Sequence, residues 1–289
     1  MKRKLVIVLG PTAVGKTDYS IALAEKYGSP IISCDSRQIY REMRIGTAVP
    51  SAEQLARVRH YFIQSHSVTQ LYTAGMYETD ALELIERLFD QGHDTLVMSG
   101  GSMFYIDALC YGISDVPKGD PPLRAELNAR LAAEGVASLA ARLRELDPVA
   151  YADMDVSNGA RVLRALEVCI ISGRPFSSFK MNAPKVRNFE IEKIGLIRPR
   201  DVIYDRINAR VLEMVEAGLI EEVRSLIPFR GLTALHTVGY TEVFNYLDDP
   251  ANISLDRTIA LIQAHTRNYA KRQMTWWKRD ESVRWISIQ

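Results

Sequence analysis

The sequence has few cysteines, no long apolar run and almost no excess charge of either sign. Cys34, Cys110 and Cys169 are widely spaced with no C-x-x-C pair, which excludes a disulfide framework or a zinc knuckle and favours a reducing cytoplasm. No segment approaches the roughly 18 apolar residues of a membrane span, so we expect no membrane contact. The apolar run after the basic N-terminus stops at Gly10, which predicts a buried strand and not a signal peptide.

The remaining composition is that of an ordinary soluble globular protein, with 289 residues, 47% hydrophobic and 25% charged, enough for about two domains. A net charge of +1 argues against a polyanion-binding protein. This average hides two basic segments, because residues 156–200 carry nine Lys or Arg against three Glu, and residues 251–289 carry seven against three acids. Residues 71–95 carry one base against six acids. Both basic segments could therefore meet phosphate groups.

Short apolar runs alternate with helical patterns in the N-terminal part. Residues 5–9, 31–34 and 95–98 predict buried strands, and residues 16–26 and 77–90 predict helices between them. This alternation predicts right-handed βαβ units and a parallel sheet.

The pattern becomes purely helical from about residue 115 to residue 180. Helical runs at 122–133, 136–145 and 158–172 follow the proline-rich DVPKGDPP. Beyond them the sequence predicts a strand at 191–197 and helices at about 201–217, 219–227, 239–247 and 254–277. We therefore expect an all-helical domain at residues 118–180, inserted into a catalytic core made of residues 1–117 and 181–289.

A phosphate-binding pattern, G-x-x-x-x-G-K-[ST], lies between the first predicted strand and the first predicted helix, which is the context that it requires. Backbone N–H groups would surround a phosphate there, Lys16 would neutralise it, and the Thr17 hydroxyl would reach Mg²⁺. The alternative is a glycine turn with a lysine that reaches solvent. The predicted diphosphate- or nucleotide-binding residues are Gly10, Pro11, Thr12, Ala13, Val14, Gly15, Lys16 and Thr17. The expected fold class is α/β, with a P-loop NTPase-like parallel sheet flanked by helices.

No acid follows the third predicted strand, where an ordinary P-loop ATPase carries its Walker B aspartate. The nearest acid at a strand end is Asp35, after the second strand, and that end of a parallel sheet faces the phosphate loop. Asp35 could accept a proton from a nucleophile that attacks a phosphate-bearing substrate, or it could simply cap the turn before Ser36.

Three further signals each have a structural alternative. The GGS turn at 100–102 could bring a hydroxyl to the same crevice or be only a tight turn. Arg206 and Arg210 share a helix face and could grip a pyrophosphate or form surface ion pairs. The segment TRNYAKRQMTWWKR mixes cations with aromatic residues, as in RNA-binding surfaces, or it is a core helix with a charged outer face.

Six segments occur in the order and spacing of the tRNA dimethylallyltransferases, also called tRNA isopentenyltransferases or the IPP transferase family. They are GPTAVGKT, ISCDSRQIYREMRIGTAVP, GGSMFYIDALCYGISDVP, ARVLRALEVCIISGRP, HTVGYTEVFNYL and TRNYAKRQMTWWKR, and the resemblance covers nearly the whole chain. It implies transfer of the dimethylallyl group of dimethylallyl diphosphate to N6 of adenosine 37 of tRNA, with release of diphosphate. The missing Walker B acid then makes sense, because the P-loop would hold a leaving group and no phosphoryl group moves.

The resemblance also implies roles for single residues. Asp35 is similar to the family's general base, Ser102 stands where the family usually has a threonine, and Arg210 matches an arginine that contacts the diphosphate. Residues that match tRNA-contacting positions are Asp35, Ser36, Arg37, Gln38, Ser102, Arg124, Ala160, Arg161, Val162, Leu163, Arg164, His236, Thr237, Val238, Gly239, Tyr240 and Thr241. The helical insertion would clasp the anticodon stem-loop, and the target adenosine would flip out of its stack. The expected cofactor is Mg²⁺ at Thr17, and we expect a cytoplasmic monomer.

Three other functions are compatible with a P-loop and an unusual acid. A prenyltransferase of free adenine nucleotides would need no basic insertion. A small-molecule kinase would use Asp35 as a hydroxyl base and would turn over ATP. A P-loop RNA-binding protein without catalysis would lose nothing functional on Asp35→Ala.

Overall fold

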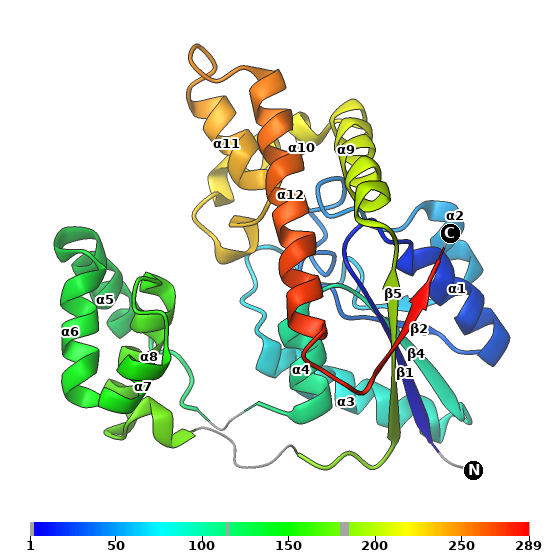
Figure 1. Cartoon of the computed structure of the whole chain (residues 1–289), viewed down its shortest axis with the longest axis horizontal. Coiled ribbons are helices and arrows are strands. Elements are labelled where there is room, and N and C mark those ends of the chain that lie inside the picture. The colour runs from blue at the N-terminus through cyan, green and yellow to red at the C-terminus, as the bar shows by residue number, and fades with distance from the viewer. Residues whose placement is uncertain (1–2, 114–115, 180–184, 289) are drawn as a thin grey trace. The chain divides into compact units, whose positions relative to one another are not determined.

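The computed structural model describes residues 3–113, 116–179 and 185–288 (Figure 1). The chain divides into two compact units, one made of Met1–Tyr111 and Val186–Gln289 and the other of Gly112–Lys185. The sequence placed the first boundary at 117/118, a few residues further along the chain. The predicted boundary at 180/181 lies outside the described residues.

The larger unit contains a sheet of six parallel strands in the order β3-β2-β4-β1-β5-β6. The strands are β1 (Lys4–Leu9), β2 (Ile31–Ser33), β3 (His60–Tyr61), β4 (Thr95–Ser99), β5 (Glu190–Ile197) and β6 (Val283–Ser287). This sheet confirms the predicted parallel α/β architecture. The sequence missed only the two edge strands, β3 and β6.

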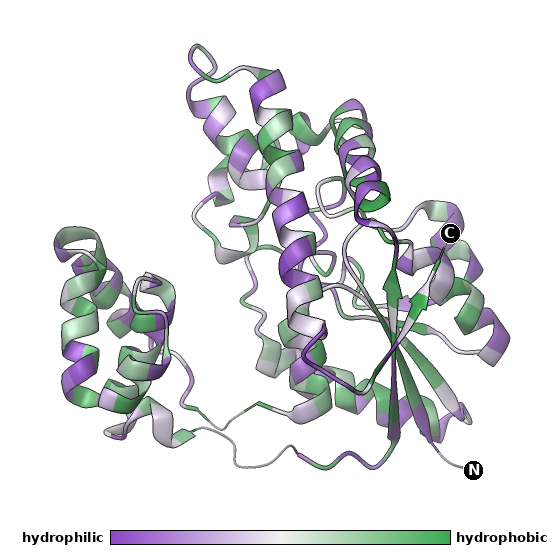
Figure 2. Cartoon of the chain, viewed as in Figure 1, coloured by the Kyte–Doolittle hydropathy of each residue, from purple (hydrophilic) through white to green (hydrophobic). Residues whose placement is uncertain are grey.

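Both faces of the sheet are buried, as the continuous apolar runs predict. Leu5, Ile7 and Leu9 of β1 belong to the core on one face, and Val6 and Val8 to the core on the other. Helices α3 (Ala74–Asp90) and α4 (Met103–Tyr111) pack on the first face, and α1 (Lys16–Tyr27) and α9 (Arg200–Glu216) on the second. Figure 2 shows mostly hydrophobic residues along the middle of the strands and a mixture of hydrophilic and hydrophobic residues along the helices around them.

The other helices of the larger unit are α2 (Ala52–Arg57), α10 (Leu219–Ser225), α11 (Tyr240–Asp248) and α12 (Leu255–Trp277), with short 3-10 turns at Ile227–Phe229 and Thr233–Leu235. Helix α12 runs alongside α9, α11 and α4. Within the described residues no helix is long and apolar enough to cross a membrane.

The smaller unit is entirely helical in its described part. It consists of α5 (Pro121–Glu134), α6 (Val136–Leu146), α7 (Pro148–Asp153) and α8 (Gly159–Ser172), followed by a 3-10 turn at Phe176–Phe179. The helices enclose a core of their own that includes Leu127, Leu143 and Leu166. Three of the helices match the predicted runs, and α7 was not predicted, because it is only six residues long.

Candidate active site

The glycine-rich loop joins β1 to α1 and is shaped by close backbone packing. Gly10 has a φ of 146°, and a Cβ there would lie 2.7 Å from the carbonyl oxygen of Leu196 in β5. Gly15 caps α1 with a φ of 109°. Both positions therefore require glycine, which lacks the Cβ that would be strained or obstructed. The loop wraps the N-terminus of α1, where backbone N–H groups favour an anion.

Lys16 lies under this loop, with its ammonium group turned back to the loop carbonyls. Its Nζ donates to the carbonyl oxygens of Gly10 at 2.8 Å and Pro11 at 2.9 Å. The pKa of Lys16 is lowered to about 8, mainly because the group is buried; Asp35 acts against this shift and nearby Arg210 adds to it. An anion bound in the loop would compensate this buried charge.

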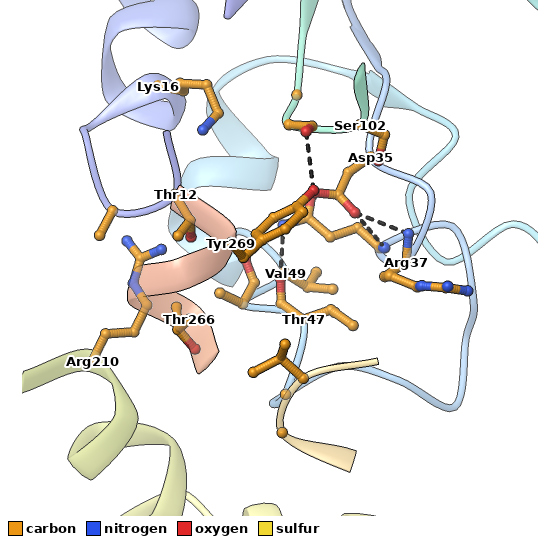
Figure 3. A pocket seen from close by; sticks show the side chains of 18 of the residues that line it. Thr12, Lys16, Asp35, Arg37, Thr47, Val49, Ser102, Arg210, Thr266 and Tyr269 are labelled. Carbon is orange, nitrogen blue, oxygen red and sulfur yellow. Dashed lines mark hydrogen bonds between the residues drawn. The ribbon is translucent and has the colours of Figure 1, made fainter. Parts of the chain in front are cut away.

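Asp35 lies two residues after β2 and begins a tight turn. Its Oδ1 accepts hydrogen bonds from the backbone N–H of Arg37 at 2.9 Å and of Gln38 at 3.2 Å (Figure 3). Both bonds use the same carboxylate oxygen and fix the plane of the group. The second oxygen, Oδ2, is thus the candidate proton acceptor.

The turn after β4 is tied to the turn after β2. Ser102 Oγ accepts from the backbone N–H of Ser36 at 2.7 Å and donates to Ser36 Oγ at 2.9 Å. A Cβ at Gly100 would lie 2.6 Å from the carbonyl carbon of Cys34, so the two turns can approach this closely only with glycine at 100. The Ser102 hydroxyl therefore helps to hold the segment that carries Asp35.

Arginines from the C-terminal half of the chain complete the phosphate loop. Arg206 Nε donates to the carbonyl oxygen of Ala13 at 2.7 Å, and Arg198 Nε donates to that of Val14 at 2.9 Å. Arg210, one turn after Arg206, points toward the loop (Figure 3). Burial and Arg206 both lower the pKa of Arg210. Of the two arginines that the sequence suggested as a pair, Arg206 holds the loop by a hydrogen bond and Arg210 lines the cavity beside the loop.

Gln273 of α12 connects the phosphate loop to the GGS turn, a role that the sequence did not suggest. Its Oε1 accepts from the backbone N–H of Thr12 at 2.9 Å, and its Nε2 donates to the carbonyl oxygen of Gly101 at 2.8 Å. Tyr269, one turn earlier, also donates to that carbonyl, at 3.1 Å. The segment AKRQ was noted, but the partners of Gln273 lie more than 170 positions earlier in the chain, where no local pattern indicates them.

A cavity of about 1270 Å³ collects most of the predicted residues of the larger unit. Its lining includes Thr12, Ala13, Gly15, Lys16, Thr17, Asp35, Ser36, Arg37, Gln38, Ser102, Arg210, His236, Thr237, Val238, Gly239 and Thr241. Tyr240 is not among the lining residues. Its ring is fully buried, and its hydroxyl donates to Glu222 at 2.6 Å. Gly10, Pro11 and Val14 belong to the loop but are not among the residues that line the cavity.

Two of the predicted tRNA-contacting side chains in this cavity also support its walls. Arg37 donates to the carbonyl oxygen of Thr233 at 3.3 Å. Gln38 Nε2 donates to the carbonyl oxygens of Thr47 at 3.0 Å and Ala48 at 2.9 Å, which holds a further wall segment in place. Arg37 and Gln38 therefore line the cavity, and both donate hydrogen bonds to backbone carbonyls of the protein.

Two of the three predicted arginines of the helical unit, Arg124 and Arg164, bind a buried carboxylate. The side chain of Glu167 is fully buried, and it accepts from Arg124 Nε at 2.9 Å and from Arg164 Nη1 at 2.5 Å. Burial alone would raise the pKa of Glu167, but the hydrogen bonds from both arginines outweigh it and lower the pKa. Arg161 is exposed on the first turn of α8. Ala160 is exposed beside it, whereas Val162 and Leu163 face the core of the unit.

A magnesium ion at this loop would be held mainly by the phosphate groups of a bound substrate. Thr17 lies on the first turn of α1 and lines the cavity beside Lys16. Nowhere in the described ranges do three or more His, Cys, Asp or Glu side chains form a group that could hold a metal. Mg²⁺ commonly takes one or two protein ligands and completes its shell with phosphate oxygens and water. The Thr17 hydroxyl fits that arrangement.

Comparison with known proteins identifies the family. A family model described as IPP transferase matches residues 38–280. The chain is 53% identical to tRNA dimethylallyltransferase 2 of Porphyromonas gingivalis over 284 residues, covering 98% of this chain and 93% of that protein. It is 48% identical to tRNA dimethylallyltransferase 2 of Parabacteroides distasonis over 282 residues, with the same two coverages.

Solved structures agree with this comparison. The tRNA isopentenylpyrophosphate transferase of Bacillus halodurans has a TM-score of 0.70 at 36% identity, covering 99% of this chain and 90% of that one. A eukaryotic dimethylallyltransferase acting on tRNA has a TM-score of 0.82 at 21% identity, covering 99% and 74%, and shares the fold. These matches confirm the resemblance seen in the six sequence segments. The chain belongs to the IPP transferase family.

Proposed function

We propose that the protein transfers the dimethylallyl group from dimethylallyl diphosphate to N6 of adenosine 37, next to the anticodon of tRNA. The products are N6-(dimethylallyl)adenosine and diphosphate. One observation carries the proposal: a single cavity holds the cations Lys16 and Arg210 together with the carboxylate of Asp35. An anionic leaving group and a nucleophile that must lose a proton need this combination.

Each charged group has a part in the transfer. N6 of the adenosine attacks C1 of the dimethylallyl group, and the bond from C1 to the diphosphate oxygen breaks with its electron pair going to the oxygen. Lys16 and Arg210 hold the diphosphate as this negative charge develops. Asp35 takes the proton that N6 loses, through the oxygen that is not used in its turn. Ser102 and Gln273 keep the surrounding turns in position.

Mg²⁺ bound beside Thr17 would add positive charge to the diphosphate and so improve it as a leaving group. The three cysteines are unpaired and buried, which suits a reducing compartment. We accordingly propose a magnesium-dependent enzyme that works as a cytoplasmic monomer.

Replacing Asp35 by asparagine tests the assignment of the base. The amide oxygen of the introduced asparagine can still accept both turn hydrogen bonds, so Asp35→Asn removes the proton acceptor and keeps the fold of the turn. We expect turnover of unmodified tRNA to fall by about 10²- to 10⁴-fold, with the dissociation constant for tRNA nearly unchanged. Turnover within a few-fold of the wild type would show that Asp35 is not the base.

A further inference from the structure

The first turn of α4 carries an exposed aromatic ring at the edge of the cavity. Phe104, two residues after Ser102, is 60% exposed and lines the cavity. The following residues Tyr105 and Ile106 are buried in the core. Because α4 buries these neighbours, core packing does not account for an exposed phenyl ring at the cavity edge.

Phe104 is held by a row of side chains behind it. Its ring meets that of Trp276 edge to face, with centroids 5.0 Å apart and planes at 67°. Trp276 Nε1 donates to Asp107 Oδ2 at 2.9 Å, and the Arg279 guanidinium carbon lies 4.2 Å from the Trp276 ring centroid. Asp107 is one turn after Phe104 on α4, so one helix anchors both rings. The phenyl ring is thus supported from α12 and still open to solvent.

We propose that Phe104 is a stacking platform for the base next to the target adenosine in the anticodon loop. This inference rests on the proposed function. When the adenosine leaves its stack, each of its neighbours exposes a base face. Proteins commonly cover such faces with aromatic side chains.

Cationic side chains line the cavity that Phe104 borders and flank its supporting ring. Arg37 and Arg272 line the same cavity, and Arg279 lies over the supporting Trp276. Guanidinium groups beside an aromatic platform can meet the phosphates of the strand whose base is stacked. The two neighbouring tryptophans of α12 have different roles. Trp277 is buried in the core, and Trp276 supports the ring of Phe104.

Steady-state kinetics on an unmodified anticodon stem-loop RNA test the platform. For Phe104→Ala we expect the KM for RNA to rise by roughly 5- to 150-fold, the range that loss of one base–aromatic stack produces. The KM for dimethylallyl diphosphate should stay the same, and so should the salt dependence of RNA binding, because no phosphate contact is lost. Phe104→Tyr keeps the aromatic face and should restore the KM for RNA.

RNAs that lack one base identify the stacked partner. An abasic nucleotide is placed on the 5′ or the 3′ side of the target adenosine, and each RNA is assayed with wild type and Phe104→Ala. With the stacked base removed, the two proteins should have the same KM for RNA. If Phe104→Ala stays within twofold of the wild type on intact RNA, or if its defect is undiminished on both abasic RNAs, the platform is refuted.

Two controls separate this result from other causes. Leu212→Ala removes an exposed apolar side chain of α9 outside the cavity lining and should leave the KM for RNA unchanged. Thermal unfolding of Phe104→Ala and Phe104→Tyr verifies that both variants fold. A wild-type protein that forms no prenylated adenosine would contradict the proposed function itself, whereas an active wild type with a normal Phe104→Ala variant contradicts only the platform.

Discussion

Gln273 offers a quantitative test of how the site is held together. In Gln273→Leu the backbone N–H of Thr12 loses its acceptor, and the carbonyl of Gly101 keeps only its bond from Tyr269. One unsatisfied donor and one further lost hydrogen bond should lower the free energy of unfolding by about 2–4 kcal/mol. For a unit of this size that corresponds to a fall in Tm of roughly 4–16 °C.

Catalysis should respond as well, because the side chain joins the phosphate loop to the turn beside Asp35. We expect kcat/KM for dimethylallyl diphosphate to fall by about 10- to 100-fold, as small displacements of positioned groups can cause. Gln263→Leu is the matched control on the same helix, since Gln263 makes one bond, at 3.2 Å, to the carbonyl oxygen of Asn208 away from the loop. A Gln273→Leu variant as stable and as active as Gln263→Leu would refute the reasoning.

Further predictions concern charge. Lys16, with a pKa of about 8, is protonated below that pH, so affinity for inorganic diphosphate should fall as pH rises through about 8. Calorimetry in buffers of different ionisation enthalpy should detect proton uptake on binding there, and a pH dependence identical in Lys16→Gln would contradict the assignment. Arg161→Ala should reduce the log–log salt slope of tRNA binding by about one unit. Arg164→Ala should instead destabilise the helical unit by about 1–3 kcal/mol, because buried Glu167 loses a partner, and a salt-slope change without destabilisation would place Arg164 on the RNA.

The sequence predicted the elements whose apolar residues form a clear run or a helical repeat. The central strands were recognisable as apolar runs, since both of their faces are buried. The edge strand His60–Tyr61 is only two residues long, and β6 (Val283–Ser287) mixes buried and exposed residues without a clear alternation. Helix α4 was not predicted, because it is apolar on most sides and periodicity cannot distinguish such a helix from a strand.

The site was predictable as far as its parts are local. The phosphate loop and Asp35 each lie directly after a buried strand, and parallel strands bring such positions to one edge. The contacts of Gln273 and Arg206 with the loop could not be predicted, because they join positions far apart in the chain. The ion pair between Arg124 and Glu167 likewise depends on how α5 and α8 pack. The pair between Arg164 and Glu167 is local, because the two residues are three positions apart on α8, and it was overlooked in the sequence.

The central claim is prenyl transfer to tRNA, and product analysis tests it most directly. The protein is incubated with unmodified tRNA and labelled dimethylallyl diphosphate, with and without Mg²⁺, and the digested nucleosides are analysed by mass spectrometry. We predict labelled N6-(dimethylallyl)adenosine at the position next to the anticodon, an equal amount of diphosphate, and no consumption of added ATP. Absence of the prenylated nucleoside with a competent tRNA, or hydrolysis of ATP in its place, would contradict the account.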